Sequence, residues 1–169
     1  VTQTAFASDN PYVSGIDGRD GLVVRDCKIT IKFDGTQGLH GSGIGSSNGD
    51  FSLSGSASLD IQINNGRDST FGTRGLETSS SGNIKIQILG TGTHIFGVGC
   101  LKANGTGNID IMVPEGKKAV DGPLVIGETA GEFNFEGALY VGYYESSYLC
   151  RTYDFNIAKN KKIIKVDAS

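Results

Sequence analysis

Proline, cysteine and clustered positive charge are all scarce in this chain of 169 residues. Proline occurs only three times, and no stretch of about ten residues shows the apolar stripe of an amphipathic helix, so we expect an almost entirely β structure. The formal net charge is −3 and the lysines and arginines are scattered. That distribution argues against nucleic acid as a partner, because such binding needs a concentrated basic surface. No apolar run is long enough for a membrane span.

The three cysteines, Cys27, Cys100 and Cys150, come without a CxxC motif or a histidine spacing suited to zinc. We interpret Cys27 and Cys100 as small core residues, with one disulfide plus a free thiol as the alternative. Asp17 and Asp20 flank a Gly-Arg pair, but calcium requires more oxygen ligands than these two supply. We therefore expect no cofactor, and calcium stays an alternative without support.

The chain is expected to be one domain of a larger secreted or surface-displayed protein. It begins at Val1 without an initiator methionine or a signal peptide, and its single methionine is Met112. Its length and even composition predict one domain over residues 1–169. The abundance of serine, glycine and asparagine, with a mildly acidic balance, favours an extracellular location.

Glycine is abundant, with 26 residues, and several glycines open a short pattern of Gly, polar, apolar, polar, apolar. Copies of this pattern begin at Gly49, Gly82, Gly107 and Gly131, and a degenerate copy occupies residues 27–31. The first apolar positions are 29, 51, 84, 109 and 133, so the steps between copies are 22, 33, 25 and 24 residues. Another apolar residue precedes each copy by five or six positions, in the order Leu22, Ile44, Leu76, Leu101 and Val125.

This two-part repeat predicts a solenoid, because periods of roughly 20–50 residues are typical of stacked repeats. Three short strands in each turn of 22–25 residues fit a parallel β-helix, in which each strand lies about 4.8 Å above its equivalent. We expect about five turns in residues 21–137, an N-terminal cap in residues 1–20 and a C-terminal cap or tail in residues 138–169. The alternative is a β-sandwich, which also has short strands and glycine turns but no constant period.

The first candidate site is the place where one copy of the repeat is longer than the others. The extra residues fall near 64–74, where Arg67, Asp68 and Arg74 form a dense charged group. Insertions in solenoids become loops on one face, often the functional one. The alternative is a solvated loop whose local ion pairs contribute little.

The second candidate site is the C-terminal region, where tyrosines accumulate at Tyr140, Tyr143, Tyr144 and Tyr148. Tyrosine rings stack on sugar rings and tolerate exposure. The alternative is that these rings pack over the last turn as its cap.

Isolated charged residues of the repeat are expected to be structural. Lys85 and Asp110 occupy the same position in successive copies, which predicts a favourable pair on the outer face, one strand apart. We interpret His40 and His94 as structural or solvent-exposed, because neither has a neighbouring serine or cysteine in a nucleophile pattern.

The segments GIGSSNGDFSLSGSASLDI (43–61) and GLETSSSGNIKIQI (75–88) resemble repeats of bacterial surface proteins with right-handed parallel β-helix carbohydrate-binding domains. That group is related in fold to pectate lyases, and the resemblance extends over about residues 21–137. It implies a right-handed coil and a carbohydrate ligand. The chain lacks the paired aspartates at adjacent positions that the active sites of catalytic relatives need.

Three functions follow as expectations. The first is a non-catalytic extracellular carbohydrate-binding or adhesion module of a bacterial surface or secreted protein, with a polysaccharide or cell-wall glycan and neighbouring domains of the same polypeptide as partners. The second is a structural spacer or assembly unit. The third is a polysaccharide lyase or hydrolase that would use Arg67, Arg74, Lys85 or Asp110.

Overall fold

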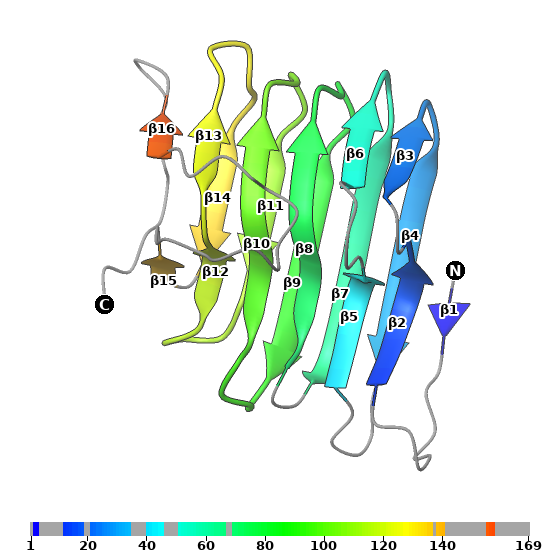
Figure 1. Ribbon diagram of the computed structural model, residues 1–169, viewed down its shortest axis with the longest axis vertical. Helices are drawn as coiled ribbons and strands as arrows, with labels where there is room; N and C mark the ends of the chain where they lie inside the picture. The colour runs from blue at the N-terminus through cyan, green and yellow to red at the C-terminus, as the bar shows by residue number, and fades with distance from the viewer. Residues whose placement is uncertain are drawn as a thin grey trace.

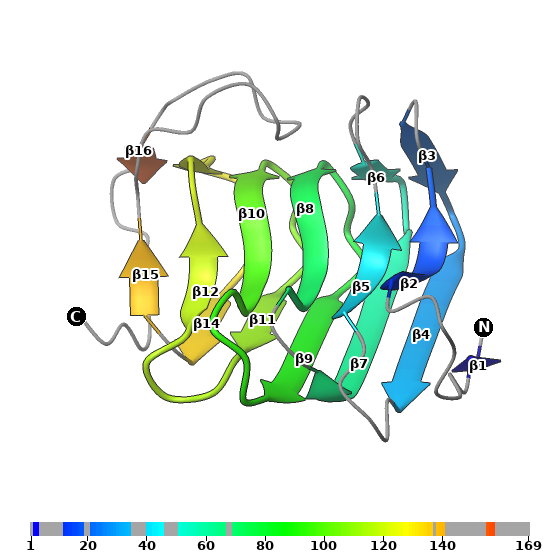
Figure 2. The ribbon, with the colours of Figure 1, turned by 60° about the horizontal axis from the view of Figure 1, so that its bottom comes forward.

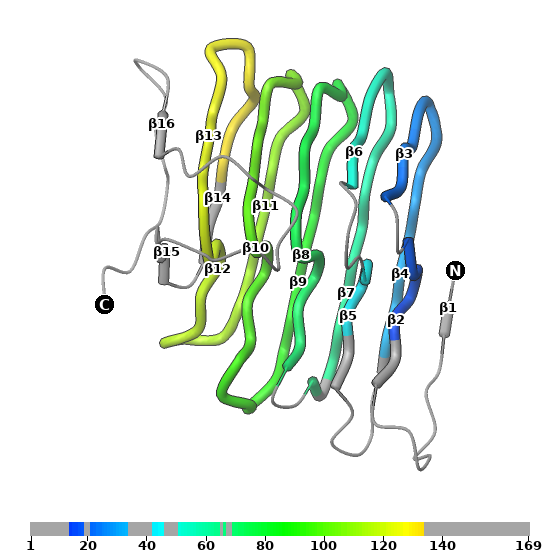
Figure 3. Tube along the Cα trace, in the orientation of Figure 1, coloured from blue at the N-terminus to red at the C-terminus, as the bar shows by residue number. Residues whose placement is uncertain are grey.

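The computed structural model describes residues 2–3, 12–18, 21–34, 40–45, 51–66, 69–136, 138–140 and 155–157, most of which are coloured in Figure 3. This part of the chain is an all-β parallel solenoid of about four turns without helices, so the predicted fold class is confirmed. Accordingly, it offers no apolar helix of membrane-spanning length.

Two stacked sheets form the solenoid (Figures 1 and 2). Sheet A has six strands: β1 (Thr2–Gln3), β4 (Lys28–Asp34), β7 (Ser58–Gly66), β9 (Ile84–Gly90), β11 (Ile109–Met112) and β14 (Phe133–Glu136). Sheet B has ten: β2 (Tyr12–Asp17), β3 (Leu22–Arg25), β5 (His40–Gly45), β6 (Phe51–Ser54), β8 (Phe71–Thr78), β10 (Phe96–Ala103), β12 (Lys118–Asp121), β13 (Leu124–Ile126), β15 (Ala138–Tyr140) and β16 (Phe155–Ile157). Every pairing between these strands is parallel, which excludes the antiparallel β-sandwich.

The number of turns follows from one row of sheet A, where a row denotes residues that are partners on successive strands. This row runs through Ile29, Leu59, Ile84, Ile109 and Phe133. Its steps, taken from these residue numbers, are 30, 25, 25 and 24 residues. Between β4 and β14 the chain therefore returns to the same face four times, so the solenoid has about four turns where about five were expected.

The sequence pattern placed Phe51 in the wrong row. Phe51 is the partner of Leu22 on β3, and Ser52 pairs with Glu77, so Phe51 lies in the sheet B row of Leu76. The predicted insertion at 64–74 is therefore wrong, because β7 extends to Gly66 and β8 begins at Phe71. A glycine followed by alternating apolar residues occurs before strands of both sheets, and the pattern alone does not distinguish them.

Three strands per turn, as predicted, are found where β2, β3 and β4 form the first turn and β5, β6 and β7 the second. In the middle of the stack β8 pairs with both β5 and β6, so one continuous strand takes the place of two. The strand β10 likewise pairs with both β12 and β13. Within the stretch expected to cap the N-terminal end, β2 pairs with β5 as part of the stack.

The two sheets approach each other closely where a row of glycines on sheet B faces a row of isoleucines on sheet A. A methyl group on Gly43 would lie 2.7 Å from Ile61 Cγ2, and one on Gly15 would lie 2.6 Å from Ile31 Cγ2. The same overlap would occur between Gly72 and Ile86. The facing isoleucines are fully buried, so each occupies the space that the opposite glycine leaves.

Side chains at the corners satisfy backbone groups between turns. The Asn83 Oδ1 accepts the N–H of Asn108 at 3.0 Å, and Asn108 Oδ1 accepts the N–H of Glu132 at 3.1 Å. Ser80 is 1% exposed, and its hydroxyl donates to the Gly55 carbonyl at 3.1 Å. These contacts hold successive corners together where the ladder of strand hydrogen bonds stops.

The cysteines differ from the expected pair of core thiols. Cys100 on β10 is fully buried and disulfide-bonded, whereas Cys27 is exposed with a free thiol. Cys27 lies at the corner between β3 and β4, where side chains face solvent. The core interpretation of Cys27 is therefore wrong, and the alternative of a disulfide plus a free thiol describes these two residues.

Asp26 links the corners of the first two turns. Its backbone has a φ of 53°, and its Oδ1 accepts the N–H of Ser56 at 2.9 Å. The Arg25 Nε lies 3.2 Å from its Oδ2, with both side chains exposed. The Ser56 N–H, and after it the Arg25 guanidinium, lowers the pKa of the Asp26 carboxyl below its ordinary value.

The facing glycine and isoleucine rows make Gly72→Ala a destabilising change. The added methyl group would overlap the Ile86 side chain and lie 2.8 Å from the Gly97 carbonyl oxygen, so we expect a loss of about 1–3 kcal/mol in the free energy of unfolding. Because Ile86→Ala removes one obstacle, the cost of Gly72→Ala should be smaller in that background, as a double-mutant cycle in urea would show. Glu77→Ala, on the exposed side of the same strand, should change stability by less than about 0.5 kcal/mol. Equal losses for Gly72→Ala and Glu77→Ala would contradict the proposed close approach.

The lowered pKa of Asp26 gives its contribution to stability a pH dependence of known sign. A carboxyl group with a lowered pKa in the folded state stabilises that state above its unfolded pKa and loses this contribution as the pH falls through the folded pKa. The difference in urea midpoint between the wild type and Asp26→Asn should therefore be largest near about pH 6 and vanish near about pH 2. The difference should be small because Asp26 is exposed. A difference that stays constant across this pH range would refute this role.

Candidate functional site

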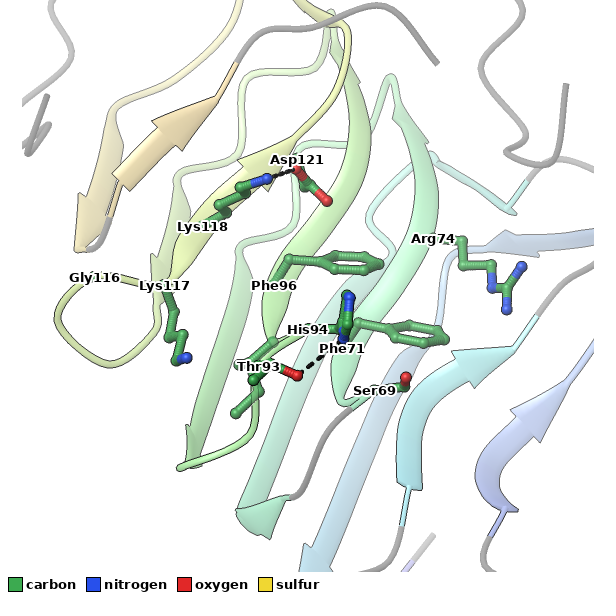
Figure 4. A pocket seen from close by; sticks show the side chains of 11 residues that line it. Ser69, Phe71, Arg74, Thr93, His94, Phe96, Gly116, Lys117, Lys118 and Asp121 are labelled. Carbon is green, nitrogen blue, oxygen red and sulfur yellow. Dashed lines mark hydrogen bonds and ion pairs between the residues drawn. The ribbon is translucent and has the colours of Figure 1, made fainter. Parts of the chain in front are cut away.

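A pocket of about 220 Å³ opens on the outer side of sheet B (Figure 4). Its lining comes from β8, β10 and β12, from the loop before β10 and from the turn before β12. Gly72 faces the core, so its neighbour Phe71 faces outward, since successive side chains of a strand alternate. Three successive turns of the solenoid therefore contribute to one pocket.

Two stacked phenylalanines form the apolar part of the pocket. Phe71 and Phe96 are partners on β8 and β10, and their ring centroids lie 4.9 Å apart with planes inclined by 4°. The Arg74 guanidinium carbon lies 5.3 Å from the Phe71 ring centroid, a cation–π distance. Both rings are almost fully buried, at 9% and 6% exposure, so only a small part of their surface is available to a ligand.

Polar groups of the loop before β10 line the rim. Thr93 Oγ1 and His94 Nδ1 lie 3.0 Å apart in a hydrogen bond. Ser69, which precedes β8, also lines the pocket. His94 is exposed, as expected, while the side chain of His40 lies outside the described residues. Hydroxyl and imidazole groups of this kind can donate to or accept from a bound ligand.

The turn before β12 brings two lysines to the pocket. The N–H of Lys117 donates to the Pro114 carbonyl at 3.0 Å, and Gly116 takes the positive φ of 73° that this turn requires. Lys118 Nζ lies 2.9 Å from Asp121 Oδ1. Asp121 Oδ1 is buried and accepts no hydrogen bond, so its contact with Lys118 is an ion pair only.

Of the predicted site residues, only Arg74 and Tyr140 lie in the described part of the chain. Arg74 lines the pocket, and Tyr140 is the partner of Asp121 on the neighbouring strand. The register puts Arg74, Gly99, Asp121 and Tyr140 in one row across β8, β10, β12 and β15. The other predicted site residues lie outside the described residues: Arg67, Asp68, Tyr143, Tyr144 and Tyr148.

The structure separates the residues of the lyase hypothesis. Lys85 and Asp110 are partners on sheet A, as predicted, whereas Arg74 belongs to sheet B, the opposite layer in Figure 2. Asp60 flanks Lys85 on its other side. The Oδ1 atoms of Asp60 and Asp110 are buried without hydrogen-bond partners. In the described ranges, no three His, Cys, Asp or Glu side chains gather as metal ligands.

Sequence reasoning missed most of the pocket. Phe71, Phe96, Lys117, Lys118 and Asp121 were not singled out as site residues, because they belong to different turns. One signal was present: Phe-Gly begins at residues 71 and 96, a spacing of 25 that matches the repeat. Comparison with protein-family models, curated proteins and solved structures found no match to this chain.

Proposed function

We propose that this protein is a non-catalytic, extracellular carbohydrate-binding or adhesion module whose ligand is a polysaccharide or cell-wall glycan. The observation that carries the proposal is the pocket on sheet B, in which the exposed part of a phenylalanine stack lies beside hydroxyl, imidazole and charged groups. An apolar surface with a few convergent polar groups suits a sugar ring, which has C–H faces and hydroxyl edges.

The size of the pocket limits how the ligand is held. At about 220 Å³ it is smaller than the roughly 300–1,000 Å³ of a typical small-molecule site. It therefore suits one sugar unit, and the rest of a longer chain would continue over the outer face of sheet B. The row from Arg74 to Tyr140 lies along this path and contains one residue from each of the two predicted sites.

The disulfide at Cys100 supports an extracellular location, because such bonds persist in oxidising compartments. Attachment to neighbouring domains of a larger bacterial surface or secreted protein belongs to the same proposal. The separation of Arg74 from Lys85 and Asp110 favours binding over the lyase or hydrolase alternative.

The test is retention of the full chain by a panel of plant and bacterial polysaccharides in affinity electrophoresis, with and without calcium. We expect retention by at least one polymer and no release of unsaturated or reducing ends. His94→Ala removes an exposed group of the rim and should weaken binding by about three- to tenfold, the value of one hydrogen bond. Lys85→Ala, on the exposed outer face of sheet A, serves as the control and should leave binding unchanged. Failure of every polymer to retain the protein would refute the function and leave the spacer alternative.

A further inference from the structure

Positive charge is concentrated in the pocket although the chain as a whole is acidic. The lining contains three cationic side chains, Arg74, Lys117 and Lys118, and one carboxylate, Asp121, whereas the formal net charge of the chain is −3. Asp121 already lies in an ion pair with Lys118 at 2.9 Å. Cationic side chains therefore outnumber carboxylates among the residues that line the pocket.

The cations come from the strands on either side of β10. Arg74 is on β8, Lys118 is the first residue of β12 and Lys117 lies in the turn before it. Neighbouring strands are separated by about 4.8 Å. Lys118 is the partner of Phe96, and Phe96 is the partner of Phe71. The Arg74 guanidinium lies over the Phe71 ring. A small group bound over the phenylalanine stack would thus have cationic side chains on both sides.

The side chain of Lys117 has no evident role in stabilising the fold. Within the part of the chain that the structure describes, no carboxylate forms an ion pair with Lys117, although its side chain is partly buried. Its backbone N–H closes the turn with Pro114, and any residue other than proline could supply that group. Figure 4 shows the lysine side chain extending from this turn at the pocket.

We propose that the pocket recognises an anionic group on the glycan, a carboxylate or a sulfate ester, through direct contact with Lys117 and with the help of Arg74 and Lys118. The inference rests on the proposed carbohydrate-binding function and names the chemical class of its ligand. Ammonium and guanidinium groups form short, charge-assisted hydrogen bonds to such oxyanions. Because like charges repel, the same pocket disfavours a calcium ion, so the anion is held without a bridging metal.

The test compares matched acidic and neutral polymers with the full chain. The pairs are a uronic-acid polymer and the same polymer with its carboxyl groups reduced to alcohols, and a sulfated polysaccharide and its desulfated form. We expect at least one acidic polymer to bind more tightly than its neutral form, by about tenfold at low salt, and the difference to shrink as salt is raised. The uronic-acid and sulfated arms distinguish a carboxylate from a sulfate ligand.

Lys117→Gln should weaken binding of the acidic polymer by about tenfold and leave binding of the neutral polymer unchanged. Lys85→Gln makes the same change of charge on sheet A and should leave both unchanged. Equal urea midpoints for the two variants would show that both are folded.

Each contrary outcome has a distinct meaning. Equal binding of acidic and neutral polymers, equal losses for Lys117→Gln and Lys85→Gln, or loss of binding when calcium is chelated would overturn the anionic inference and leave carbohydrate binding in place. No binding to any polymer, acidic or neutral, would overturn the proposed function itself.

Discussion

The close approach of the two sheets is the constraint on which the rest of the structure depends. A row of glycines on sheet B, including Gly43 and Gly72, faces a row of isoleucines on sheet A, including Ile61 and Ile86. A shift of one residue in either sheet would turn every side chain to the opposite face. Each isoleucine would then leave the core, and a residue with a side chain would stand where only glycine fits. The register is therefore fixed independently in each turn.

That register also determines what lies outside the core. Because Gly72 and Gly97 must face inward, the preceding residues Phe71 and Phe96 are turned to the outer face and stack on each other. The packing of glycine against isoleucine in the core therefore also places the phenylalanine stack of the pocket. At the corners, the side chains of Asn83 and Asn108 join successive turns by hydrogen bonds to the backbone of the next turn.

The sequence predicted the class of fold because its signal is local and repeated. Alternating apolar residues after a glycine specify a short strand with one buried face, and a period near 25 residues specifies stacking. Which of the two sheets a strand joins is not determined by its local sequence. Phe51 and Leu59 both follow small polar residues and both are buried, yet one belongs to sheet B and the other to sheet A. The candidate site was only partly predictable for the same reason: Arg74 and Lys117 line one pocket only when three turns are stacked.

Charged side chains are arranged differently on the outer faces of the two sheets. The difference distinguishes charges that stabilise the fold from charges that could bind a ligand. On sheet A, Asp60, Lys85 and Asp110 alternate in sign along one row, an arrangement that lowers repulsion between stacked strands and needs no ligand to explain it. On the outer side of sheet B, Arg74, Lys117 and Lys118 line one pocket together with a single carboxylate, Asp121. Partial burial of Lys117, for which the described residues supply no ion-pair partner, costs free energy. A spacer gains nothing from such a lysine, whereas a site for an anionic ligand offsets the cost when the ligand binds.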